Sequence, residues 1–114
     1  MTADEFRGLA LSLPEAAEAA HMGHPDFRVE GKIFASLWHT NDRGTVKLTP
    51  DQQEMLLAAE PEMFTPAAGA WGRKGWTTVW IDRADAATLQ SALAMAWRNT
   101  APAKMRSRLE GERM

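Results

Sequence analysis

The sequence predicts a single α+β domain, in which N- and C-terminal helices pack on one face of an antiparallel meander sheet. Apolar residues recur at helical spacing near both ends, consecutive segments between them alternate polar and apolar residues, and 114 residues fit one domain. Helices that flank consecutive strands leave the other face of the sheet partly open to solvent. We therefore expect antiparallel strands throughout and no parallel strand–helix–strand crossover.

The first helix is expected over residues 3–12. Thr2 and Glu5 have the spacing of a capping box, in which each side chain bonds to the backbone N–H of the other residue. Apolar residues follow at helical spacing, and Pro14 stands just beyond the end of the helix. The alanine-rich stretch after Pro14 has little periodicity, and we expect a short strand there that ends before Gly23.

A meander of strands follows, with short turns between them. The first strand alternates polar and apolar residues, as a half-exposed strand does, and the second is apolar, β-branched and aromatic, which indicates deeper burial. Gly31-Lys32 is expected to be a turn, and so is Asn41 to Gly44, where Gly44 suits a positive φ. The meander strands and one later strand are expected over residues 26–30, 33–39, 45–49 and 77–82.

Two further helices are expected, over residues 52–59 and 84–98. Thr49 or Asp51 can cap the former, and Asp85 can cap the latter. The apolar side chains that we expect to face inward are Met55, Leu56 and Ala59 in the former and Leu89, Ala92, Leu93, Ala96 and Trp97 in the latter.

The composition limits where the protein works and what it contains. The chain has no cysteine, which removes disulfides and thiolate metal sites and fits a reducing compartment. Its start shows no basic segment followed by an apolar one, and no apolar run approaches the ~20 residues of a membrane span. We therefore expect a cytoplasmic, monomeric, single domain over residues 1–114, without cofactor or membrane contact, in which residues 101–114 form a basic, partly frayed extension.

No complete catalytic constellation is visible, so we expect a binding protein and not an enzyme. None of the four serines lies in a G-x-S-x-G turn, and the glycines form no phosphate-binding loop. His21, His24 and Asp26 bring two imidazoles and a carboxylate close together, but their spacing matches no closed metal site. We interpret this segment as a polar turn between strands and predict no metal.

The segment from Trp71 to Trp76 is the most informative for function. Two tryptophans bracket Arg73, Lys74 and two glycines, and such residues can stack on bases and neutralise phosphates. The alternative is a β-hairpin with the cations at its exposed tip and the tryptophans at its base. We expect Trp76 to be a core residue and Trp71 to be exposed.

The net charge of −2 gives no global case for nucleic acid, but the charges are unevenly distributed. Residues 28–50, 71–100 and 101–114 each carry four bases and two acids. These segments could converge on one basic face or remain ordinary solvated charges.

Several stretches, read in order from about residue 4 to 105, resemble the YjbR/MmcQ family. They are Leu13-Pro14-Glu15, Phe27 to Ala35, Val46-Lys47-Leu48, Gly75 to Val79, Ala96-Trp97 and Ala103-Lys104. The chain has Gly75 where the family often has a histidine, and Trp97 where a tyrosine is usual. The resemblance implies a CyaY-like α+β fold and the label "DNA-binding".

The leading hypothesis is therefore weak, salt-sensitive DNA binding through a basic and aromatic surface. The alternative is a small-molecule or protein-partner module that uses the open sheet face and the Trp71–Trp76 turn. A tryptophan-lined concavity of roughly 300 Å³ or more would favour the small molecule, and a continuous positive surface would favour nucleic acid. The candidate binding residues are Trp71, Arg73, Lys74, Trp76, Arg28, Lys32, Lys47 and Lys104.

Overall fold

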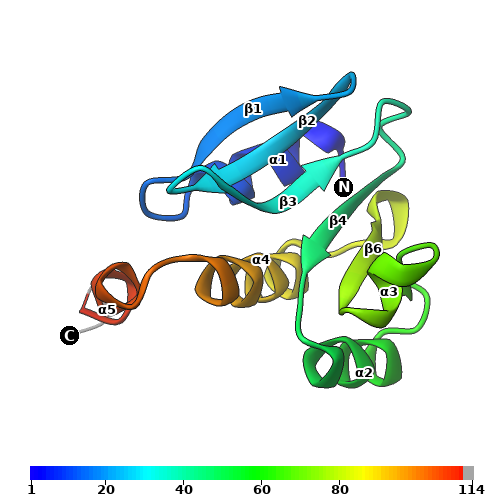
Figure 1. Ribbon diagram of the computed structural model, residues 1–114. Helices are drawn as coiled ribbons and strands as arrows, with labels where there is room; N and C mark the ends of the chain where they lie inside the picture. Colours follow the sequence, from blue (N-terminus) through cyan, green and yellow to red (C-terminus); the bar gives the residue numbers. More distant parts are fainter. Residues whose placement is uncertain (112–114) are drawn as a thin grey trace.

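The computed structural model describes residues 1–111, with side chains to residue 107; the end expected to fray, residues 112–114, lies outside this range. Figure 1 shows the arrangement of the helices and strands. In chain order they are α1 (Ala3–Leu11), β1 (Ala17–His21), β2 (His24–Val29), β3 (Lys32–Leu37), β4 (Arg43–Lys47), α2 (Pro50–Ala59), β5 (Phe64–Pro66), α3 (Ala70–Arg73), β6 (Trp76–Trp80), the 3₁₀ turn η1 (Ile81–Arg83), α4 (Ala86–Thr100) and α5 (Ala103–Gly111).

The strands form one antiparallel sheet in the order β1-β2-β3-β4-β6-β5. Strands β1 to β4 are consecutive neighbours, which confirms the predicted meander, and no parallel crossover joins the described strands. β5 was not expected, because three residues that end in Pro66 are too short to show an alternating pattern.

Helices α1 and α4 lie together on one face of the sheet, with α4 against β3 and β4 (Figure 1). Asp85 caps α4 as predicted, because its carboxylate accepts a hydrogen bond from the Thr88 backbone N–H at 2.9 Å. The apolar face expected for α4 is buried, and Trp97 is fully enclosed. The α+β fold class is therefore confirmed.

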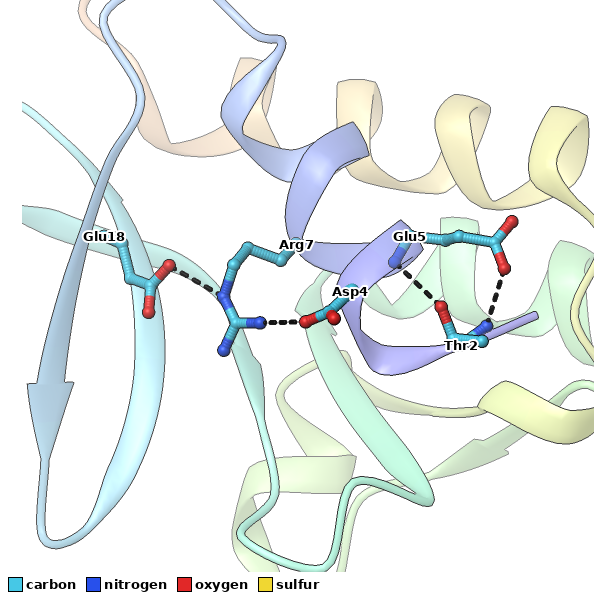
Figure 2. Close-up of polar contacts among 5 residues, drawn as sticks. All are labelled: Thr2, Asp4, Glu5, Arg7 and Glu18. Atoms are coloured by element: carbon cyan, nitrogen blue, oxygen red, sulfur yellow. Dashed lines mark hydrogen bonds and ion pairs between the residues drawn. The ribbon is translucent and has the colours of Figure 1, made fainter.

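Polar contacts fix α1 at its start and against β1, as Figure 2 shows. Thr2 and Glu5 form the predicted capping box, with N···O distances of 3.1 and 3.2 Å. Arg7 bridges Asp4, at 2.6 Å, and Glu18 of β1, at 2.9 Å. The last contact joins the helix layer to the edge strand of the sheet.

The predicted positive φ of Gly44 is wrong. Gly44 lies within β4, and the positive φ in the preceding turn, 61°, belongs to Asn41. Glycine is required at this position because Phe6 packs over it: a Cβ would lie 2.7 Å from Phe6 Cζ and 2.7 Å from the Ser36 carbonyl oxygen.

Helix α2 buries less of its surface than predicted. Thr49 caps it through a capping box with Gln52, and Leu56 is buried, but Met55 is 50% exposed and Ala59 is also exposed. The reason is position: α2 contacts β5 and β6 at the edge of the sheet and does not lie across it (Figure 1). None of the helices in residues 1–111 is long and apolar enough to cross a membrane.

Candidate functional site on the open sheet face

The sheet face opposite α1 and α4 carries a continuous row of polar side chains. The strand register places Asp26, Ser36, Thr45, Thr78 and Thr65 side by side across five strands. We call these five residues the polar row. Ser36 Oγ and Thr45 Oγ1 lie 2.5 Å apart and hydrogen-bond to each other.

A β-bulge in β3 brings Ile33 onto the same face. Phe27 pairs with Ala35, but the next residue, Arg28, pairs with Ile33, so that Phe34 has no partner in the register. A bulge bends the strand and increases its twist. Phe34 and Ala35 are both buried against the helices, whereas Ile33 lines the open face.

An open hollow of about 400 Å³ lies over the polar row. It exceeds the size set out above for a small ligand and falls in the usual range of ligand pockets. Its lining is mostly apolar and aromatic and consists of His21, His24, Asp26, Ile33, Ser36, Leu37, Trp38, Thr45, Ala67, Ala68, Trp71 and Trp76.

One wall of the hollow is built around Trp38, directly after β3. The Trp38 backbone N–H donates to the Arg43 carbonyl at 3.0 Å, and the Arg43 guanidinium lies 4.7 Å from the Trp38 ring centroid and 5.3 Å from that of Trp80. The His24 ring meets Trp38 edge-on at 5.1 Å and lies 5.3 Å from the ring of His39. His24 Nδ1 is buried and has no hydrogen-bond partner within the described part of the chain.

The opposite wall is formed by Trp71 of α3 and Trp76 of β6. Their rings meet nearly at right angles, 85°, with centroids 6.0 Å apart, and Trp71 is 61% exposed. Lys74 Nζ lies 5.4 Å from the Trp71 ring centroid. Gly75 lets the chain pass close to β4, because its φ is 109° and a Cβ would lie 2.0 Å from the Leu48 carbonyl oxygen. The glycine therefore serves backbone packing within the protein.

Gln53 of α2 holds this second wall in place. Its Nε2 amide lies 3.0 Å from the carbonyl oxygens of Gly72 and Trp76 and 3.2 Å from Thr77 Oγ1. These contacts connect α2 to both ends of the segment that carries the two tryptophans. Sequence reasoning assigned Gln53 only to a helix, because such long-range contacts leave no local signal.

Asp26 contributes a carboxylate to the hollow that is already neutralised. It is 2% exposed, and its two oxygens accept hydrogen bonds from Arg28 Nε, at 2.8 Å, and Nη2, at 3.1 Å. The hydrogen bond with Asp26, helped by charge attraction, raises the pKa of the Arg28 guanidinium. Arg28 therefore stays charged and cancels the Asp26 charge.

Some of the predicted binding residues meet at the hollow and others do not. Trp71 and Trp76 line it, Lys74 stacks on Trp71, Arg28 pairs with Asp26 of the lining, and Lys47 is the cross-strand partner of Trp76. Arg73 is exposed on α3, Lys32 at the start of β3 and Lys104 on α5, and none of these three lines the hollow.

Two predictions about the Trp71–Trp76 segment are wrong in part. Trp76 is half-buried on the open face and is not a core residue, because β6 buries Thr77 and Val79 against the helices. The segment joins the antiparallel strands β5 and β6, but it does so through a turn of helix, α3, and not through a simple hairpin. The exposure predicted for Trp71 is confirmed.

The segment from His21 to Asp26 is the hairpin between β1 and β2, as the polar-turn interpretation required. Met22 and Gly23 form its tip with positive φ, and His21 pairs with His24. Within residues 1–111, no group of three or more histidines and carboxylates is arranged to hold a metal ion. Both imidazoles instead border the hollow.

The hollow lies entirely within the part of the chain that matches known proteins. The YjbR family profile matches residues 11–99. The crystal structure of the Deinococcus radiodurans protein DR2400, which carries a DUF419 domain, is similar with a TM-score of 0.72 and 26% sequence identity, over 84% of this chain and 75% of that one. No curated protein matches the chain. Since the profile covers the whole sheet and most of α4, the chain belongs to the YjbR family.

Proposed function

We propose that this protein is a small-molecule binding module whose site is the hollow on the open sheet face. The observation that carries the proposal is the hollow itself, about 400 Å³ in volume and walled by Trp38, Trp71 and Trp76. Aromatic walls with a few polar groups beneath them are typical of ligand pockets. A concave surface of this kind suits a compact ligand better than the flat surface of a protein partner.

The proposal is one of binding without catalysis. The Ser36 hydroxyl bonds to Thr45 and not to an imidazole, so the lining residues form no nucleophile–base pair. The carboxylate of Asp26 is held by Arg28, and the proposal assigns no proton transfer to it or to the imidazoles of His21 and His24. What the hollow offers is stacking surface and a small number of hydrogen-bonding groups.

A thermal-shift screen against planar aromatic compounds tests this function. A ligand that binds the hollow at 100 times its Kd should stabilise the protein by about 2.7 kcal/mol, and Trp71→Ala should reduce that shift. Trp71 suits this substitution because its side chain is exposed, so its loss should change the free energy of unfolding little. The proposal fails if no compound raises the melting temperature at millimolar concentration.

Weak nucleic-acid binding is the second candidate function. It is favoured by the exposed Trp71 with Lys74 above its ring and Arg73 beside it, the combination that stacks on bases and contacts phosphates. The double variant Arg73→Ala/Lys74→Ala should weaken binding to all DNA sequences equally and flatten the slope of log K against log salt by about two units at most. The absence of any mobility shift at ~50 mM salt would exclude this function.

A further inference from the structure

We propose that the ligand of the hollow is a planar aromatic anion, that is, an aromatic ring with a carboxylate or phosphate group. This inference rests on the proposed binding function and specifies its ligand class. Three observations carry it: unpaired hydrogen-bond donors, the cations beside the hollow, and the positions of two of these cations over tryptophan rings.

The tryptophans of the hollow have unused hydrogen-bond donors. Trp80 Nε1 donates to Thr65 Oγ1 and Trp97 Nε1 donates to the Pro14 carbonyl, each at 2.9 Å. The indole N–H groups of the three tryptophans that line the hollow have no hydrogen-bond partner in residues 1–111; these are Trp38, Trp71 and Trp76. An indole nitrogen can only donate, so these three groups suit a ligand that carries hydrogen-bond acceptors.

Three cations neighbour the lining of the hollow: Lys74 over Trp71, Arg43 over Trp38, and Lys47 opposite Trp76 in the strand register. The one carboxylate of the lining, Asp26, is paired with Arg28. Lys47 and Lys74 form no ion pair with the described residues, and Arg43 reaches only Asp42, at 4.0 Å. A ligand whose charge complements these cations is therefore an anion.

Aromatic walls can also bind cationic ligands. In this hollow, the positions of the protein's own cations disfavour a cationic ligand. The protein's own cations already lie over two of the three indole rings of the lining: Arg43 is 4.7 Å from the Trp38 centroid, and Lys74 is 5.4 Å from that of Trp71. A cationic ligand would compete for these positions and meet like charges. An aromatic ring in the corner between Trp71 and Trp76 instead places its anionic group on the side of Lys74, with Lys47 opposite Trp76 in the strand register.

A matched set of three ligands with the same ring tests the inference by calorimetry: 2-naphthoate, 2-naphthalenemethanol and 2-naphthylmethylammonium. The carboxylate should bind about tenfold more tightly than the alcohol, and the ammonium should bind most weakly. The preference for the carboxylate over the alcohol should shrink in high salt and in the double variant Lys47→Gln/Lys74→Gln. Arg106→Gln, a change on α5 outside the lining of the hollow, should leave it unchanged.

Adenosine monophosphate and adenosine form a second arm, which distinguishes a phosphate source from a carboxylate source. Tighter binding of either anion than of its neutral partner supports the inference. The inference is overturned if the ammonium binds as tightly as the carboxylate or more tightly, or if both neutral ligands bind as tightly as their anions or more tightly. A binding function would then remain in place. If none of the five ligands binds, the inference is wrong; the proposed function is wrong as well only if the wider thermal-shift screen also finds no ligand.

Discussion

The tryptophans in this chain divide into those that hold the fold and those that face outward from the sheet. Trp97 of α4 is fully buried, and its indole N–H donates to the Pro14 carbonyl. Trp76 lies half-buried on the other side of the sheet, where it contacts Trp71. Substitution of these two residues should therefore affect different properties.

Trp97→Ala should lower the free energy of unfolding by about 3–5 kcal/mol, because it leaves a large cavity in the core. Trp76→Ala should cost about 1–2 kcal/mol, since it removes only partly buried apolar surface, but it should weaken ligand binding. Urea unfolding of both variants measures the difference. An equal loss of stability would show that Trp76 belongs to the core after all.

Glycine at a positive φ can be required by the backbone conformation alone or also by lack of space for a Cβ, and Gly31 and Gly75 represent these two cases. Both have positive φ, 109° and 76°, but a Cβ at Gly31 meets nothing within 4 Å, whereas one at Gly75 meets the Leu48 carbonyl oxygen. Gly31→Ala should cost about 1–2 kcal/mol in the free energy of unfolding from backbone strain alone. Gly75→Ala should cost clearly more. Similar melting temperatures for the two variants would contradict the close backbone contact.

At the scale of the elements, α2 supports the hollow from outside it. It buries only Leu56, yet Gln53 bonds to both ends of the segment that carries Trp71 and Trp76. Its role is thus to position a wall of the site more than to extend the core.

Gln53→Glu should lower the free energy of unfolding by about 2–3 kcal/mol, because it removes the amide donor and places a carboxylate beside two carbonyl oxygens. The control is Gln90→Glu, the same chemical change at an exposed position of α4, which should stay within about ±0.5 kcal/mol. Both are measured by urea unfolding. Equal effects would mean that the Gln53 contacts contribute nothing.

The cap of α4 should make stability depend on pH. The Thr88 backbone N–H donates to Asp85, and this bond holds the pKa of Asp85 below its usual value. A lowered pKa means that the stabilisation is complete above the unfolded pKa of about 3.9 and is lost as the pH falls through the folded value. The stability difference between wild type and Asp85→Asn should therefore be constant from about pH 7 to 5 and shrink below about pH 4. An unchanged difference at pH 3 would contradict this assignment.

The elements with local signals were predictable from the sequence. Asp85 and the periodic apolar residues after it define α4, and the alternating segments define the meander. β5 and α3 were not predictable, because they are too short for any periodicity and depend on pairing with β6. The prediction that Met55 faces inward was also wrong, because helical spacing does not tell which part of a helix reaches the core.

At the scale of the whole molecule, the sheet separates the hydrophobic core from the proposed binding surface. One face carries α1, α4 and the core, and the other carries the polar row and the hollow. Most of the hollow was not predictable, because the neighbourhood of Ser36 and Thr45 depends on strand register, and that of Ile33 depends on the bulge at Phe34. The open sheet face with the Trp71–Trp76 turn was visible as a candidate in the sequence, whereas His21, His24 and Asp26 were considered only as a metal site.

The most direct test of the central claim, that the hollow is the binding site, is a titration of the ¹⁵N-labelled protein with 2-naphthoate, followed through the five indole N–H signals in NMR spectra. The claim predicts that the signals of Trp38, Trp71 and Trp76 move together, that Trp80 moves less, and that Trp97, on the other face, stays. Single Trp→Phe variants assign the signals. Movement of Trp97 with no movement of the three tryptophans of the hollow would contradict the claim.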